Sequence, residues 1–62
     1  MSFKERLVEE REQLAERLQK LTSFIGGEVY QGLQPADQGL LDRQHQIMED
    51  YLSVLDVRIT RS

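Results

Sequence analysis

Hydrophobic residues recur at helical spacing in the first part of the chain. Three leucines stand at intervals of seven residues, and the two other apolar positions lie four residues beyond a member of this row. These positions are Leu7, Leu14, Leu18, Leu21 and Ile25. Ser2 is a favourable N-cap, and Glu5 three residues later completes a capping-box pattern. The pattern predicts a helix over residues 3–25.

A stretch rich in glycine follows this helix. We expect the glycines at positions 26–27 to end it, because glycine adopts the left-handed turn at a helix C-terminus without steric cost. Residues 29–33 are too few for a full helix but can form one helical turn. Pro35 is a favourable first residue of a second helix, since its missing N–H costs nothing there.

The second periodic segment, residues 35–61, carries parallel rows at heptad spacing. One apolar row is Leu41, Met48 and Leu55, the next is Leu40, Ile47 and Val54, and a third row is Gln44, Tyr51 and Arg58. The apolar stripe is wider than one partner helix can cover. We therefore predict a single all-α domain over residues 1–62, an antiparallel two-helix hairpin. Its uncovered apolar side is expected to pack on copies of itself, as a dimer or a dimer-based assembly.

Composition narrows the function classes. The chain has 62 residues, no cysteine and one histidine, so neither a disulfide nor a structural zinc site is expected to stabilise it. The net charge of −3 argues against a protein that coats nucleic acid. No apolar run approaches the ~20 residues of a membrane span, and the acidic N-terminus has no signal-peptide core. We expect a soluble intracellular protein without a metal or cofactor.

Arg11 and Tyr51 are the first candidate site. Folding the hairpin at residue 31 places Arg11 near Tyr51, and the heptad row of Arg11 continues with Leu18 and Ile25. Arg11 can pack its stem and reach water while stacked on Tyr51. Alternatively the two form a pocket, with a flat ring for a base and a guanidinium fork for phosphate. A third possibility is an ion pair between Arg11 and a glutamate of another subunit.

Basic residues at the open end of the hairpin are the second candidate site. They are Lys4, Arg6, Arg58 and Arg61. Arg58 and Arg61 can stabilise the C-terminal dipole of the long helix. Alternatively, several chains can bring these groups together as an anion site, in which Arg58 is favoured because its row is expected to face inward beside Tyr51. His45 is expected to be a solvent-facing polar residue.

Catalytic motifs are not recognisable. No serine has a plausible base and orienting group nearby, and the segment IGGEVYQG lacks the lysine and spacing of a phosphate loop. We therefore expect a protein that is not an enzyme.

The segment from Leu21 to Ile59 resembles a family of short, mostly uncharacterised proteins encoded by tailed phages and prophages. The matching residues are Leu21, Phe24, Ile25, Tyr30, Leu33, Gln38, Leu40, Leu41, Gln44, Met48, Tyr51, Val54, Leu55, Arg58 and Ile59. Family members usually carry proline directly after the position of Leu33, whereas here it stands at Pro35. The resemblance implies a phage protein that acts in the bacterial host cytoplasm.

The inferred size and architecture are also similar to phage sponge proteins that defeat CBASS and Thoeris immunity by trapping cyclic nucleotides or cyclic ADP-ribose derivatives between subunits. By this analogy the chain sequesters a nucleotide-derived signal. Tyr51 would stack on a base, and Arg11, Arg58 and Lys4 would contact phosphates. The alternatives are a helical inhibitor or adaptor of a host protein and a structural accessory protein of the phage.

Overall fold

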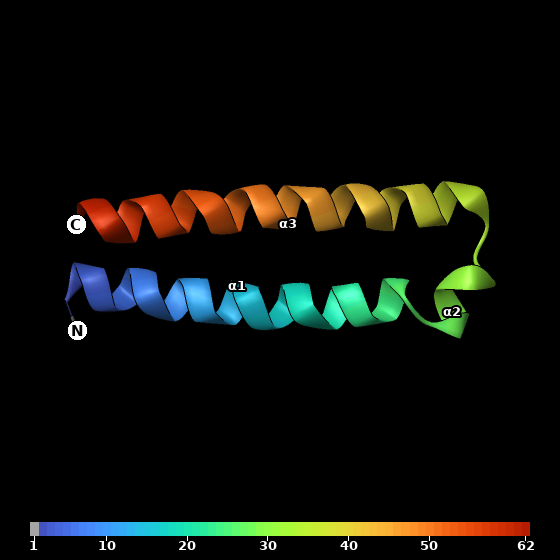
Figure 1. The fold of residues 1–62 in the computed structure, drawn as a ribbon, viewed down its shortest axis with the longest axis horizontal. Helices are drawn as coiled ribbons and strands as arrows, with labels where there is room; N and C mark the ends of the chain where they lie inside the picture. Colours follow the sequence, from blue (N-terminus) through green and yellow to red (C-terminus); the bar gives the residue numbers. More distant parts are fainter. Residues whose placement is uncertain (1) are drawn as a thin grey trace.

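The computed structural model describes residues 2–62 and contains three helices, α1 (Phe3–Ile25), α2 (Glu28–Gln31) and α3 (Pro35–Arg61). The two long helices run antiparallel along each other, and α2 lies at the bend between them (Figure 1). The result is a rod with extents of 44 × 15 × 13 Å. The predicted helical hairpin, with long helices over 3–25 and 35–61, is confirmed, whereas its assembly into an oligomer stays a prediction.

Both ends of α1 lie where the sequence predicts, but the backbone conformation at its C-terminal end differs from the prediction. The backbone N–H of Glu5 donates to the Ser2 hydroxyl at 3.1 Å, as expected of an N-cap. Gly26 keeps helical angles (φ −79°, ψ 0°) and Gly27 is extended (φ −102°, ψ 177°). The predicted left-handed glycine turn is therefore wrong. One extended residue is sufficient to end the helix, and Gly27 at the same time serves as the N-cap of α2.

Polar contacts attach the bend to the second long helix. The Tyr30 hydroxyl donates to the Asp42 carboxylate at 2.7 Å, and the Gln38 side-chain amide donates to the Tyr30 carbonyl at 2.8 Å. Pro35 stands at the start of α3 as predicted. The bend is thus held by side chains of α3 as well as by the glycines.

The core between α1 and α3 is small. Its buried side chains are Leu7, Leu14 and Leu55, with Met48, Leu52 and Ile59 packed against them. A chain of this length cannot bury a large fraction of its surface, so the hairpin has little apolar burial to set against the entropy of folding.

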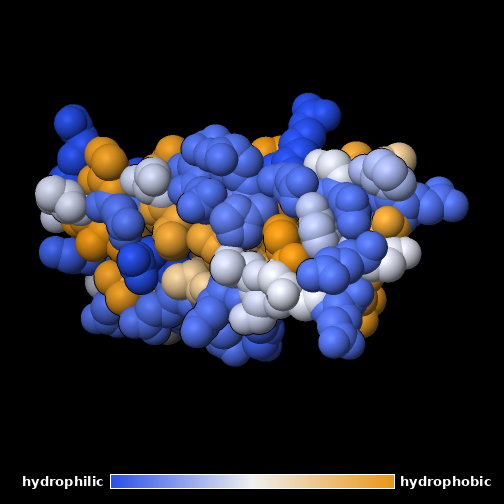
Figure 2. Space-filling view, turned by 45° about the vertical axis from the view of Figure 1, so that its right-hand side comes forward, coloured by the Kyte–Doolittle hydropathy of each residue, from blue (hydrophilic) through white to orange (hydrophobic). Residues whose placement is uncertain are grey.

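The neighbouring apolar row of α3 stays at the surface. Leu40, Ile47 and Val54 are 65%, 56% and 52% exposed. Figure 2 shows orange hydrophobic side chains reaching the surface of the rod between blue hydrophilic ones. The expectation that one partner helix cannot cover the stripe is confirmed. Within residues 2–62, no helix combines the length and apolar composition needed to cross a membrane.

Candidate functional site

Tyr51 lies at the edge of the helix pair and contacts α1. Its hydroxyl donates to the Glu10 carboxylate at 2.6 Å, and its side chain is 42% exposed. The pKa of the phenol is raised above its usual value, mainly by this hydrogen bond and then by desolvation and the charge of Glu10; the positive charge of Arg58 lowers it. The row of Tyr51 and Arg58 was expected to face inward, but both residues are exposed.

Arg58 lies one heptad beyond Tyr51 and packs over a second aromatic ring. Its guanidinium carbon is 5.9 Å from the centroid of the Phe3 ring, within cation–π range. Both residues line an open groove of about 420 Å³ at the open end of the hairpin. The other lining residues are Arg6, Leu7, Glu9, Glu10 and Gln13. We call this side of the hairpin the Tyr51 flank, defined by Phe3, Glu10, Tyr51 and Arg58.

The groove balances opposite charges within one chain. Two guanidinium groups, from Arg6 and Arg58, line it together with the carboxylates of Glu9 and Glu10. Arg58 also stands in the last turn of α3, where a cation complements the helix dipole. An anionic ligand would meet two favourable and two unfavourable charges here. Binding a phosphate tightly would therefore require further cations.

Arg11 lies on the opposite side of the hairpin from Tyr51. Its Nε donates to the Asp56 carboxylate at 2.7 Å, and this hydrogen bond and the charge of Asp56 raise the pKa of the guanidinium. Successive residues of an α-helix differ by about 100° in direction. Glu10 therefore points to the Tyr51 flank, whereas Arg11 points to the opposite side of the hairpin. The expected approach of Arg11 to Tyr51 within one chain is not observed among residues 2–62.

Lys4 does not line the groove that contains Arg58. It lines a different surface depression at the start of α1, together with Ser2, Glu5, Val8 and Glu9. Of the four predicted site residues, the hairpin therefore brings together only Tyr51 and Arg58, whose charge acts on the phenol.

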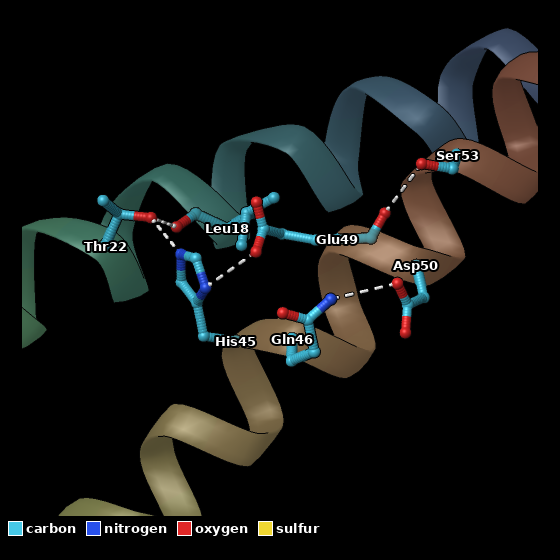
Figure 3. A network of polar contacts seen from close by, with 7 residues as sticks. All are labelled: Leu18, Thr22, His45, Gln46, Glu49, Asp50 and Ser53. Carbon is cyan, nitrogen blue, oxygen red and sulfur yellow. Dashed lines mark hydrogen bonds and ion pairs between the residues drawn. The ribbon is translucent and has the colours of Figure 1, made fainter.

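His45 connects the two long helices (Figure 3). It stands eleven residues before Asp56, the partner of Arg11, and so lies on the same side of α3 as Asp56. Its Nε2 lies 2.8 Å from the Thr22 hydroxyl, and its Nδ1 lies 3.2 Å from the Glu49 carboxylate. The Thr22 hydroxyl donates to the Leu18 carbonyl at 2.8 Å, so its oxygen accepts the hydrogen bond from the Nε2–H of His45. With a side chain only 26% exposed, His45 is not the solvent-facing residue that was expected. It is a cross-helix structural contact.

The sequence interpretation missed the α1 contribution to the Tyr51 flank. Phe3, Leu7, Glu10 and Leu14 follow one another at spacings of four, three and four residues, which places them on one stripe of a helix. This spacing is visible in the sequence alone. Phe3 and Glu10 belong to the same face as the leucines and so come close to α3.

Comparisons with known proteins give one match. No curated protein and no solved structure matches the chain. The model of the Sequestin family matches residues 1–61, nearly the whole chain. The match is consistent with the resemblance to small phage-type sequestering proteins. The chain therefore belongs to the Sequestin family.

Proposed function

We propose that this protein is a phage-encoded, non-catalytic binding protein that sequesters a nucleotide-derived host immune signal in pockets between subunits. The signal would be a cyclic oligonucleotide or a molecule of the cyclic ADP-ribose type, bound in the cytoplasm of the bacterial host. The family name, Sequestin, suggests sequestration rather than catalysis. The observation that carries the proposal is the Tyr51 flank. There Phe3, Arg6 and Arg58 line one open groove, and Tyr51 lies beside it through its hydrogen bond to Glu10, which also lines the groove.

This chemistry suits a nucleotide. An exposed aromatic ring offers a face on which a base stacks, whatever its identity. A guanidinium binds phosphate oxygens through two parallel hydrogen bonds. Tyr51 and Arg58 keep the roles proposed from the sequence. Phe3 and Arg6 line the same groove as Arg58, and Tyr51 stands beside this groove through its contact with Glu10.

The charge balance of the groove supports binding between subunits. Glu9 and Glu10 offset Arg6 and Arg58 within one chain. A neighbouring subunit can supply the missing cations, and Lys4 and Arg11 face surfaces away from their own Tyr51 flank. Under this proposal, Lys4 and Arg11 reach the phosphates of a ligand held mainly by another chain.

The test is native mass spectrometry and isothermal titration with a panel of cyclic dinucleotides, cyclic trinucleotides and cyclic ADP-ribose isomers. The wild-type protein is expected to gain the mass of one panel member. The double variant Tyr51→Ala/Arg58→Ala should lose affinity at least ~100-fold, because it removes a stacking surface and a charged phosphate contact. The matched control is Arg61→Ala, which removes an exposed cation from the same helical turn and should bind within about twofold of wild type.

Unchanged ligand binding by the double variant would show that the Tyr51 flank is not the site. A wild-type protein that takes up no panel member would contradict the proposed ligand class. It would favour the alternative of a helical inhibitor or adaptor that binds a host protein.

A further inference from the structure

One apolar row of α3 faces solvent along the middle of the helix. Leu40, Ile47 and Val54 are each more than half exposed and stand seven residues apart. Residues at this spacing drift by only about 20° per step, so the three side chains form one line about 20 Å long. Single exposed aliphatic residues are ordinary on a protein surface, whereas an aligned set on one helix is typical of an interface.

We infer that this row is a homodimer interface in which α3 packs antiparallel against α3 of a second copy, with the two-fold axis at Ile47. Leu40 and Val54 are equally distant from Ile47 along the chain. The two-fold axis therefore places Leu40 opposite Val54 of the second copy and Ile47 opposite its own equivalent. Every layer of the row is then apolar on both sides, as an isologous interface requires.

The charged residues beside the row are complementary in the same arrangement. Arg43 stands four residues before Ile47, and Asp50 stands three residues after it on the same side of the row. The two-fold rotation places this side of the row on the same face of the dimer in both copies. Arg43 of each copy therefore lies beside Asp50 of the other. Among residues 2–62, Arg43 forms no ion pair within its own chain.

Asp50 also distinguishes the antiparallel arrangement from the parallel one. A parallel pairing would place Arg43 against the side of Gln44 and leave Asp50 without a cation. Charge complementarity thus selects the antiparallel arrangement.

Two further observations favour a second copy as the occupant. Among residues 2–62 only Leu7, Leu14 and Leu55 are buried, so the chain gains stability from any assembly that covers the row. The pairing also turns the Tyr51 sides of both α3 helices toward the same face of the dimer, with the two Tyr51 residues about 12 Å apart along the helix axis. The inference does not depend on the proposed ligand and is tested without one.

The first test measures the mass of the ligand-free protein by sedimentation equilibrium. Wild type is expected to have twice the 7.3 kDa mass of the chain. Ile47→Glu places two carboxylates at the centre of the interface and should weaken dimerisation at least ~100-fold while the helical circular dichroism persists. Ser53→Glu, the matched control, adds the same charge on an exposed position away from the row and should remain dimeric. A monomeric wild type, or a dimeric Ile47→Glu variant, would overturn the inference.

The second test fixes the direction of the helices. The chain has no cysteine, so single introduced cysteines report pairing without background. An oxidised mixture of Leu40→Cys and Val54→Cys chains should form the mixed disulfide dimer, because these positions face each other only in the antiparallel arrangement. Leu40→Cys alone should cross-link poorly. Preferential cross-linking of Leu40→Cys chains to each other would refute the antiparallel arrangement.

Discussion

The two apolar rows of α3 have similar composition and opposite environments. Leu55 has no exposed surface, while Val54, one residue earlier, is 52% exposed. Adjacent helical residues point about 100° apart, so only one row can face α1. The comparison shows that the position of a side chain around the helix, and not its hydrophobicity, decides which residues hold the hairpin together. The other row stays exposed and is the surface of the dimer proposed above.

The largest expected effect is the loss of stability caused by a substitution in the buried row. Leu55→Ala should lower the free energy of unfolding by about 3 kcal/mol, because it removes buried methyl groups and leaves a cavity in a core of three leucines. Val54→Ala should cost less than about 1 kcal/mol in dilute solution, where the proposed dimer dissociates. Urea denaturation followed by far-ultraviolet circular dichroism measures both variants.

If Leu55→Ala and Val54→Ala lowered the free energy of unfolding equally in dilute solution, the assignment of one row as buried and the other as exposed would be contradicted. Raising the protein concentration provides a control. The cost of Val54→Ala should grow with concentration, because the proposed interface forms and its row becomes buried.

A smaller effect sharpens the contrast between the side of α3 that faces α1 and the side that faces away. His45→Ala should lower the free energy of unfolding by about 1 kcal/mol, since it removes the contact with Thr22 across the hairpin and the contact with Glu49. Gln46→Ala removes only an exposed hydrogen bond to Asp50 within α3 (Figure 3) and should cost about 0.3 kcal/mol. Thermal unfolding of both variants tests this order, and a larger loss for Gln46→Ala would contradict it.

The smallest effect concerns the boundary between the two rows, where Tyr51 contacts Glu10. The pKa of Tyr51 lies above the ordinary value of 10.0 because the hydrogen bond to Glu10 favours the neutral phenol. Its stabilising contribution is therefore present below pH ~10 and is lost as the pH rises through the pKa of the folded state. Glu10→Gln should lower the pKa of Tyr51 toward its ordinary value.

Ultraviolet absorbance of tyrosinate during an alkaline titration measures this shift. The chain has two tyrosines, so the titration is performed in a Tyr30→Phe background. Glu9→Gln is the matched control, because Glu9 does not accept the Tyr51 hydroxyl. An unchanged pKa in Glu10→Gln would show that the hydrogen bond does not form in solution.

The site was only partly predictable because each candidate depended on which way its helix faces. Heptad spacing correctly related Tyr51 to Arg58, since both lie on one helix and need no knowledge of its partner. The approach of Arg11 to Tyr51 required the rotation of α1 relative to α3. The residue of α1 that contacts Tyr51 is Glu10, one position before the expected Arg11, and Arg11 contacts Asp56 instead.

Local chemistry alone was sufficient for the helices themselves. Ser2, Pro35 and the apolar periods determine where α1 and α3 begin and how far they extend, because capping and periodicity act within a few residues along the chain. The tertiary structure decided that Leu55 is buried and Val54 is not, and that Tyr51 and Arg11 lie on opposite sides. The reason is physical: a helix presents all its sides equally until a second helix packs against one of them, and the direction of that packing depends on contacts between distant residues.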